Sequence, residues 1–296
     1  HRTSRLPDGS DMLGDFAPGR NIYRTRNPDL WFQMTARDQE FFQTAVWNTA
    51  DGEQRRTERI DIVFGAGAVD EMYLYWRGDR LLQLPMNYLR PLDGWANSAG
   101  YHDGTANFDR QILPRCLECH ATYFEHVPAT RNRYNRDHFI VGVSCERCHG
   151  PGSEHVAYHR AFPDDDNGKN IVDPRELSHK QLLDLCAQCH SEAGEHRTDP
   201  FSYHPGEPLE QSFVQLSWDK PREDDHTGNQ VRYLQQSRCF EHSRELTCIT
   251  CHDPHQPEGP KNAASARRSC LPCHQAAHCG AQDRLPAALR GRCIDC

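Results

Sequence analysis

The pentapeptide Cys145-Glu146-Arg147-Cys148-His149 has the pattern Cys-x-x-Cys-His, which occurs five times in this chain. The other four copies are Cys116–His120, Cys186–His190, Cys248–His252 and Cys270–His274. On a helical turn, positions i, i+3 and i+4 lie on one face, so we expect both thiols and the imidazole of each copy to point at one common group. This repeated pattern decides how the second half of the chain is built.

The pattern is the attachment signature of c-type haem, in which two cysteines tether the macrocycle and the histidine binds iron. We therefore predict ten haem-attaching cysteines, namely Cys116, Cys119, Cys145, Cys148, Cys186, Cys189, Cys248, Cys251, Cys270 and Cys273. The predicted proximal iron ligands are His120, His149, His190, His252 and His274. A sixth pair, Cys293 and Cys296, ends the sequence. We predict that it also attaches haem c, which gives six haems.

Two other chemistries use pairs of cysteines at this spacing. The pairs that begin at Cys116 and Cys145 could form a four-thiolate zinc site, and iron–sulfur clusters also use runs of cysteine. Neither chemistry needs a histidine directly after the second thiol of every pair. Haem is the preferred interpretation, with zinc as the alternative.

All 14 cysteines follow residue 115, so the chain divides by composition. We predict a β-rich haem-free domain at 1–110 and a multihaem c-type cytochrome domain at 111–296. Hydrophobic residues make up only 36% of the chain, which is little for a packed core, and buried porphyrins would supply the missing apolar surface.

From Leu30 to Leu89, short bursts of aromatic and β-branched residues alternate with turn residues, a pattern typical of a β-meander. One hairpin is expected where the strand ending at Trp76 turns through Arg77–Arg80 into Leu81–Leu84, with a glycine in the turn. Gly65 and Gly67 are interpreted as a turn rather than a nucleotide-binding loop, because the third glycine of that motif is absent.

From Cys116 onward the sequence predicts short helical turns and loops. The clearest helix begins near Ser178, where Ser178 and Gln181 form a capping box, and it leads into Cys186 and His190. The predicted fold class is α+β with much irregular structure: a small β-rich N-terminal domain and then a haem-packed domain of short helices and loops.

The formal charge of -8 becomes more negative with two propionates per haem, which argues against nucleic acid as a partner. The expected partners are other redox proteins or like subunits. No run approaches the roughly 20 apolar residues that cross a bilayer. Because covalent haem attachment takes place outside the cytoplasm in bacteria, we expect a periplasmic or extracellular protein that has lost a leader, and a processed or partial chain.

The second axial ligand decides whether a haem iron only passes electrons or also binds substrate. All four methionines precede the haem motifs, whereas many of the 18 histidines lie outside them, so bis-histidine ligation is the default. His155 and His255 are the first candidates, because rigid Gly/Pro spacers hold them beside a motif. His278 and His242 come next. Weaker candidates are His1, His126, His138 and His226, and a surface or propionate-contacting role is expected for His102, His159, His179, His196 and His204.

Two cysteines, Cys239 and Cys279, belong to no haem motif. Exported proteins seldom leave two thiols free, so we predict a disulfide between them, with a pair of buried thiols as the alternative.

The segments Gly142–His155 and Leu246–His255 resemble the multihaem cytochrome c superfamily, more narrowly the group related to the tetrahaem cytochrome of ammonia-oxidising bacteria. The resemblance implies that the histidine at the end of each segment ligates a neighbouring haem. The N-terminal part is similar to relatives in which a haem motif precedes a β-rich insertion. In those relatives a histidine like His1 is a distal ligand, but the preceding motif is absent here.

The sequence is compatible with three functions. The leading hypothesis is an extracytoplasmic electron carrier with closely packed haems, which is supported by the short intervals between the last motifs. The alternative is a multihaem oxidoreductase that acts on a small nitrogen or sulfur compound at one open-site haem. A third interpretation is a subunit of a conductive filament, in which copies of the chain donate histidines to one another.

Overall fold

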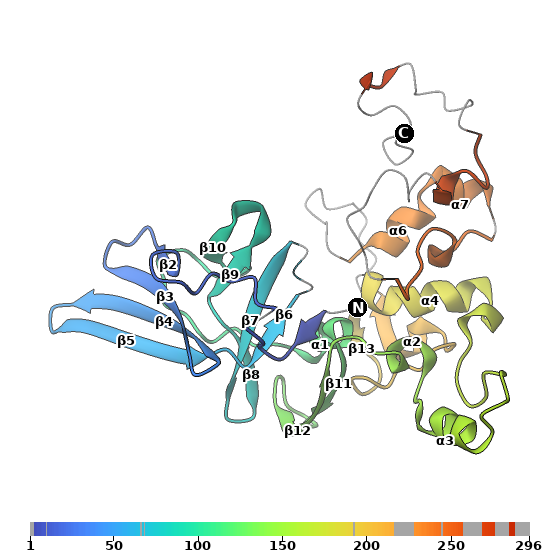
Figure 1. The fold of residues 1–296 in the computed structure, drawn as a ribbon, viewed down its shortest axis with the longest axis horizontal. Coiled ribbons are helices and arrows are strands. Elements are labelled where there is room, and N and C mark those ends of the chain that lie inside the picture. The colour runs from blue at the N-terminus through green and yellow to red at the C-terminus, as the bar shows by residue number, and fades with distance from the viewer. Residues whose placement is uncertain are drawn as a thin grey trace. The chain divides into compact units, whose positions relative to one another are not determined.

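The computed structural model describes residues 3–9, 11–65, 67, 69–191, 193–215, 228–243, 245–256, 268–275 and 284–287. Backbone contacts divide the chain into two compact units. Unit 1 comprises residues 1–174 and 194–215, and unit 2 comprises residues 175–193 and 216–296. Figure 1 labels their helices and strands.

Unit 1 contains two antiparallel sheets formed by the N-terminal part of the chain. The first sheet has the order β2-β3-β4-β5, with β2 (Ile22–Arg24), β3 (Leu30–Arg37), β4 (Glu40–Thr49) and β5 (Gly52–Arg59). The second has the order β1-β6-β7-β9-β10, with β8 paired to β7. Its strands are β1 (Ser4–Arg5), β6 (Ile62–Phe64), β7 (Asp70–Arg77), β8 (Arg80–Gln83), β9 (Met86–Leu89) and β10 (Gly94–Asn97). The predicted β-meander is confirmed.

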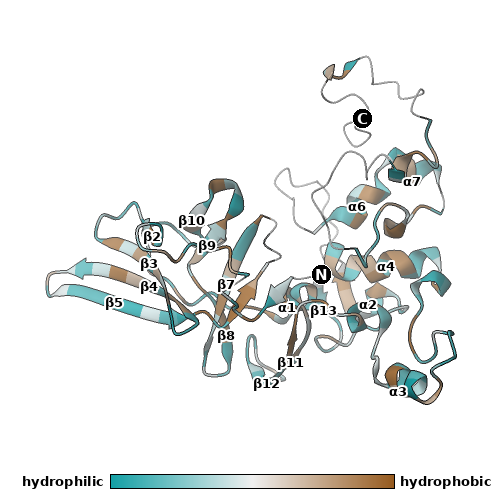
Figure 2. Cartoon of the chain, viewed as in Figure 1, coloured by the Kyte–Doolittle hydropathy of each residue, from teal (hydrophilic) through white to brown (hydrophobic). Residues whose placement is uncertain are grey.

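One hydrophobic core joins these two sheets. It includes Phe32 and Met34 of β3, Tyr73 and Tyr75 of β7, and Trp95 of β10, all with at most 8% of their surface exposed. Buried and half-buried residues alternate along the first six positions of β3, as the two-residue period of a strand requires. By contrast, β5 is hydrophilic along its length (Figure 2), as suits a charged edge strand that resists pairing with other chains.

The turns predicted from glycine are present. Gly78 connects β7 to β8 with a φ of 63°, and Gly65 and Gly67 have φ values of 115° and 71°. Each of these values lies in the region that residues with a Cβ rarely adopt.

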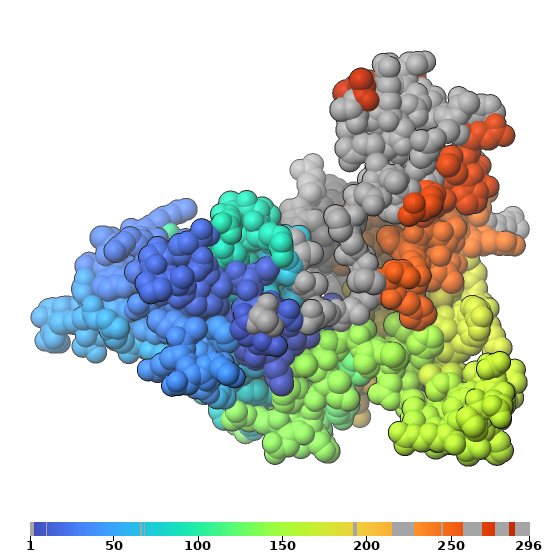
Figure 3. Space-filling model, in the orientation of Figure 1, coloured from blue at the N-terminus to red at the C-terminus, as the bar shows by residue number. Residues whose placement is uncertain are grey.

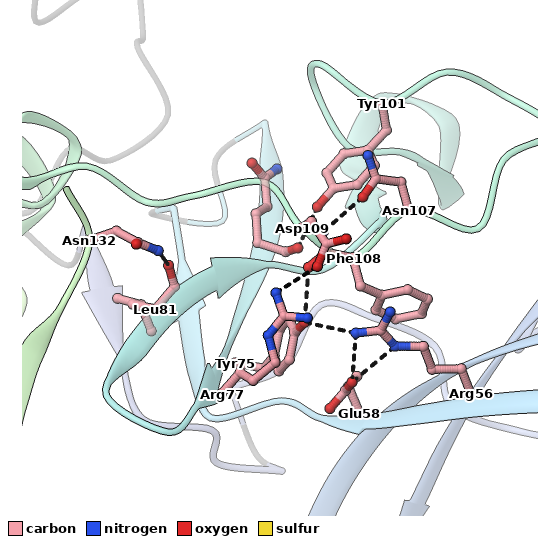
Figure 4. A network of polar contacts seen from close by, with 11 residues as sticks. Arg56, Glu58, Tyr75, Arg77, Leu81, Tyr101, Asn107, Phe108, Asp109 and Asn132 are labelled. Carbon is pink, nitrogen blue, oxygen red and sulfur yellow. Dashed lines mark hydrogen bonds and ion pairs between the residues drawn. The ribbon is translucent and has the colours of Figure 1, made fainter. Parts of the chain in front are cut away.

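A polar network holds the segment before the first cysteine against both sheets (Figure 4). The Arg56 guanidinium on β5 lies 4.4 Å from the Phe108 ring centroid and donates to the Tyr75 hydroxyl at 3.2 Å. Tyr75 in turn donates to the backbone oxygen of Phe108 at 2.9 Å, and Arg77 bonds Asp109 at 2.6 Å. These contacts fix where the chain leaves the β-rich region.

A second hydrophobic cluster continues past this segment into the first motif. It joins Phe64 and Leu74 of the second sheet to Leu117 of α1 (Pro114–His120), and to Phe124 and Tyr134 of a hairpin. The hairpin pairs β11 (Ala121–His126) with β12 (Tyr134–Val141). The domain boundary predicted at residue 110 rests on the cysteines, all of which follow it in sequence. It remains a prediction.

The hairpin adds strands to a part of the chain where we expected only helical turns and loops. A second pair, β13 (Ala193–His196) and β14 (Phe213–Gln215), does the same. Aromatic and β-branched residues such as Tyr123, Phe124, Phe139 and Ile140 favour strands, and the nearby haem motifs hid that signal. The α+β class with much irregular structure is confirmed.

The helices are short. Besides α1, they are α2 (Glu146–His149), α3 (Ser153–Ala161), α4 (His179–His190), α5 (Leu209–Ser212), α6 (Gln230–Gln235) and α7 (Arg238–His242), with 3-10 turns η1 (Arg90–Leu92), η2 (Pro174–Glu176) and η3 (Cys248–Thr250). In unit 2 the capping box of Ser178 and Gln181 begins α4 as predicted, and Leu182, Leu183 and Leu185 of that helix are buried. No described helix is both long and apolar enough to cross a bilayer.

Candidate haem-attachment site

The five Cys-x-x-Cys-His segments all form a helical turn. The first and third lie at the ends of α1 and α4. In the other three, the histidine N–H donates to the backbone oxygen of the first cysteine at 2.9 Å, in His149, His252 and His274. The predicted placement of thiols and imidazole on one face therefore follows from the local backbone.

The imidazole of His120, in the first motif, is held by the N-terminal strand and the second sheet. Its Nδ1 donates to the backbone oxygen of Thr3 at 3.1 Å, and the Phe64 ring stacks on it at 4.0 Å. Burial lowers the pKa of His120, while the bond to Thr3 opposes that shift. A neutral imidazole with Nδ1 occupied presents Nε2 as its free nitrogen.

The backbone of the first motif is tied to the same strand. The Ser4 hydroxyl donates to the His120 backbone oxygen at 2.5 Å and accepts from the N–H of Gly142 at 2.9 Å. Figure 3 shows the dark blue atoms of the N-terminal segment next to the green atoms of the part of the chain that contains the first two motifs. Residues more than a hundred positions apart therefore build one site.

The second motif is held by a segment that follows it. His149 Nδ1 donates to the backbone oxygen of Val172 at 2.9 Å, and the Val172 N–H donates back to the His149 backbone oxygen at 2.9 Å. Gly150, directly after the histidine, has a φ of 78° and turns the chain away from α2. The second imidazole is thus oriented like the first.

The third motif shows the same arrangement in unit 2. His190 Nδ1 bonds Oε1 of Gln230, on α6, at 3.3 Å. The Cys186 thiol forms a hydrogen bond with Cys248 that lowers the pKa of Cys248 to about 7. The third and fourth motifs therefore place their first cysteines side by side.

The fourth and fifth motifs are more exposed. Cys251, His252, Cys273 and His274 are all exposed, and Ser269 bonds the backbone oxygen of Cys251 at 3.2 Å. The backbone turns of both motifs are formed, whereas their imidazoles are exposed at the protein surface.

These residues fit the haem that the sequence predicts. A histidine that ligates a metal ion almost always donates its other ring N–H to a carbonyl or carboxylate, which fixes the ring and its tautomer. His120, His149 and His190 each have an oxygen acceptor on Nδ1, so Nε2 is the ring nitrogen that would bind iron. Two thiols lie on the same helical turn as each of these histidines, as thioether attachment needs.

The predicted distal ligands differ in their surroundings. His155 on α3 has Nδ1 bonded to the backbone oxygen of Lys169 at 2.7 Å, and its ring lies 4.6 Å from that of His159. His255 is exposed beside Asp253 at 3.7 Å, and His242 ends α7. His155 thus shares the Nδ1 arrangement of His120, His149 and His190.

Several predicted residues lie outside the described residues. They are His1, His278, His226, Cys293, Cys296 and, for the predicted disulfide, Cys279. Their roles therefore stay predictions.

A group of side chains around the first two motifs could not be predicted from the motif pattern. Glu118 and Arg147, inside those motifs, are buried, and both contact the segment that holds His196 and Phe201. For His196 the sequence predicts a surface or propionate-contacting role. A charged residue between two haem cysteines was the signal available, but the motif assigns no role to that position.

Residues 94–150 match the model of the family described as cytochrome c554 and c-prime. This segment contains the first two motifs, α1, the β11–β12 hairpin and α2. Over this segment, the chain is similar to that cytochrome family. The resemblance inferred from the sequence is confirmed, and the family is one of haem-binding electron-transfer proteins.

Other comparisons add less. A solved structure, the undecaheme cytochrome from the S-layer of Carboxydothermus ferrireducens, aligns with a TM-score of 0.32 and 15% identity. The alignment covers 75% of this chain and 36% of that one, so the chain spans little more than a third of its length. No curated protein matches this sequence.

Proposed function

We propose that this chain is an exported multihaem cytochrome that passes electrons through six closely packed haems, most of them ligated by two histidines. The observation that carries the proposal is the shared state of His120, His149 and His190, whose Nδ1 atoms are all bonded to oxygen. Rings fixed in this way bind iron through Nε2 with little reorganisation.

Contacts between motifs support close packing. The Arg147 side chain, in the second motif, bonds the backbone of the first motif at Glu118, and Cys186 of the third motif bonds Cys248 of the fourth. Thioether bonds at these cysteines would bring the edges of neighbouring macrocycles together in pairs. Haem iron supplies one-electron chemistry, and the protein supplies attachment, orientation and electrostatics.

Bis-histidine ligation leaves no open position on iron for a substrate. We propose His155 as one distal ligand, because its Nδ1 is bonded to Lys169 and its Nε2 is oriented by that bond. His255, His242, His278 and His1 are proposed for other irons on the basis of the sequence.

The proposed location is periplasmic or extracellular, because thioether attachment takes place outside the bacterial cytoplasm. The acidic charge of -8 suits basic redox partners, and further copies of this chain are the other proposed partner. In the second case the assembly would be a conductive filament.

Three measurements test this proposal. Intact mass should show six haems per chain, low-temperature EPR of the oxidised protein should show only low-spin haem, and carbon monoxide should leave the reduced visible spectrum unchanged. A high-spin haem that takes carbon monoxide would favour the oxidoreductase alternative. Bound zinc with no covalent haem would overturn the proposal altogether.

A further inference from the structure

A buried polar link joins the first two motifs through equivalent positions. Glu118 and Arg147 are each the second residue between the two cysteines of their motif. Arg147 donates from Nε at 3.2 Å and from Nη2 at 3.1 Å to the backbone oxygen of Glu118. Only 7% of Arg147 and none of Glu118 is exposed. The link therefore lies directly beside the second cysteine of each motif.

The Glu118 carboxylate extends this link to a third segment. Its Oε1 accepts from the N–H of Phe201 at 2.7 Å, and its Oε2 accepts from Nε2 of His196 at 2.7 Å. The Phe201 ring lies 5.4 Å below the Arg147 guanidinium. Phe201 and His196 thus cover the link from residues that follow the third motif in sequence.

Backbone strain marks the same place. Phe201 has a φ of 63°, in the left-handed region that costs a side-chain-bearing residue free energy. Its N–H is the group that Glu118 binds. The surrounding contacts over-determine this conformation, as they do at sites where position matters.

Stability alone does not explain the choice of residues. Burying a guanidinium and a carboxylate carries a large desolvation cost, and well-packed apolar residues often stabilise a protein as much. A charged link of this kind also constrains orientation. A planar guanidinium that donates two hydrogen bonds to one oxygen fixes the angle between the two groups as well as their distance. Here it fixes Cys119 relative to Cys148.

We propose that Arg147 is a positioning residue for electron transfer between the first and second haems. This inference rests on the proposed function. The two bonds of the Arg147 guanidinium hold the two attachment turns at a set separation. Functional sites require such positions to within a fraction of an ångström. The buried positive charge of Arg147 also favours the reduced state of the adjacent haem, because an added electron is stabilised by a nearby cation in a low-dielectric site.

Two substitutions separate geometry from charge in the full-length, haem-loaded protein. Arg147→Lys keeps the charge but loses the two-bond contact and the ring stacking. Arg147→Gln loses the charge as well. Arg160→Gln, at an exposed arginine on α3, is the matched control. Redox titration followed by EPR reports both the midpoint potentials and the magnetic interaction between neighbouring haems.

We expect Arg147→Gln to lower the midpoint potential of one haem, so that its oxidised-to-reduced ratio at fixed potential rises at least tenfold, about 59 mV for one electron. Arg147→Lys should move that potential much less. Both variants should weaken the magnetic interaction of one haem pair, and Arg160→Gln should change neither readout.

Unchanged potentials and unchanged haem interaction in haem-loaded Arg147→Gln would overturn the inference. If that variant does not retain its second haem, unchanged haem interaction in Arg147→Lys would overturn it instead. Wild-type protein without haem at Cys116 and Cys145, by peptide mass, would mean that the proposed function has failed. Haem present but insensitive to Arg147 would mean that only this inference has failed.

Discussion

The first and fourth motifs have the same sequence pattern and the same helical turn, but they differ in what surrounds the histidine. His120 lies against Phe64 and Thr3, within a core that the β-rich region shares. His252 is exposed, and its backbone N–H donates to the backbone oxygen of Cys248 within the motif. The pattern therefore sets the turn, whereas distant segments set the environment.

The same contrast separates the cores of the two units. The β-rich part of unit 1 buries large aromatic residues such as Phe32, Tyr73 and Tyr75 without any cofactor. In unit 2 the described buried apolar residues are few: Leu182, Leu183, Leu185 and Ala187 of α4, and Val231 of α6. Because apolar burial drives folding, we expect haem to supply much more of the core in unit 2 than in the β-rich part of unit 1.

The largest effect is therefore expected on removing haem. A chain in which all six cysteine pairs are replaced by alanine should keep the β-rich part of unit 1 folded and lose structure in unit 2. Hydrogen exchange with peptide resolution would show protection in β3, β4 and β7 and none in α4 and α6. The haem-loaded wild type is the control. Equal protection of both units without haem would refute the contrast.

The next effect tests the anchor of the N-terminal strand. Glu71 is fully buried and pairs with Arg5, and it also accepts from the Leu13 N–H at 2.8 Å and the Tyr73 hydroxyl at 3.1 Å. Glu71→Ala leaves the Arg5 charge unpaired, which should lower the free energy of unfolding of unit 1 by about 3–5 kcal/mol. Denaturant unfolding followed by tryptophan fluorescence measures this loss.

The exposed pair of Glu53 and Arg55 is the matched control. Glu53→Ala removes a similar ion pair at the surface, where such pairs contribute about 0–1 kcal/mol. Similar losses in Glu53→Ala and Glu71→Ala would show that the N-terminal strand is not anchored by burial.

The sequence predicted those features that depend on neighbouring residues. The meander, the turn at Gly78, the capping box at Ser178 and the helical turns of the motifs all follow from short patterns. Each needs only contacts within a few positions, for which residue type is informative.

Features that depend on long-range contacts were missed. Thr3 meets His120 across 117 positions, and Glu118 meets His196 across 78. A threonine carbonyl carries no signal in sequence, and a glutamate between haem cysteines has the same letter whether it is buried or exposed. Glu118 is buried while Glu146, in the second motif, is exposed, although both lie between haem cysteines.

A smaller effect is expected at the start of α4, the helix that carries the third motif. The Ser178 hydroxyl accepts from the Gln181 N–H, and the Gln181 side chain accepts from the Ser178 N–H at 2.9 Å. Ser178→Ala should destabilise the helix by about 1 kcal/mol, as loss of an N-cap usually does. Hydrogen exchange in α4 should quicken several-fold, while exchange in β7 stays unchanged.

The conservative variant Ser178→Thr should behave almost as wild type. Equal exchange in α4 of wild type and Ser178→Ala would show that haem packing, rather than the cap, holds this helix.

The smallest effect concerns α3, which lies in unit 1 but has no buried residues and so resembles the fourth motif in exposure. The Tyr158 hydroxyl donates to Asp165 at 2.6 Å, and this bond, with further bonds from Asn167, lowers the pKa of Asp165 to about 2. A carboxyl whose pKa is lowered on folding stabilises the loop above its ordinary pKa of about 3.9, and that contribution is lost as pH falls through 4 towards 2. Tyr158→Phe should raise the pKa of Asp165 part of the way back, since the Asn167 bonds remain.

Carboxyl NMR of the labelled protein would follow this titration, with Asp165→Asn to assign the signal. An unchanged pKa in Tyr158→Phe would mean that the Asn167 bonds alone set it, and that the tyrosine hydroxyl on α3 does not hold Asp165.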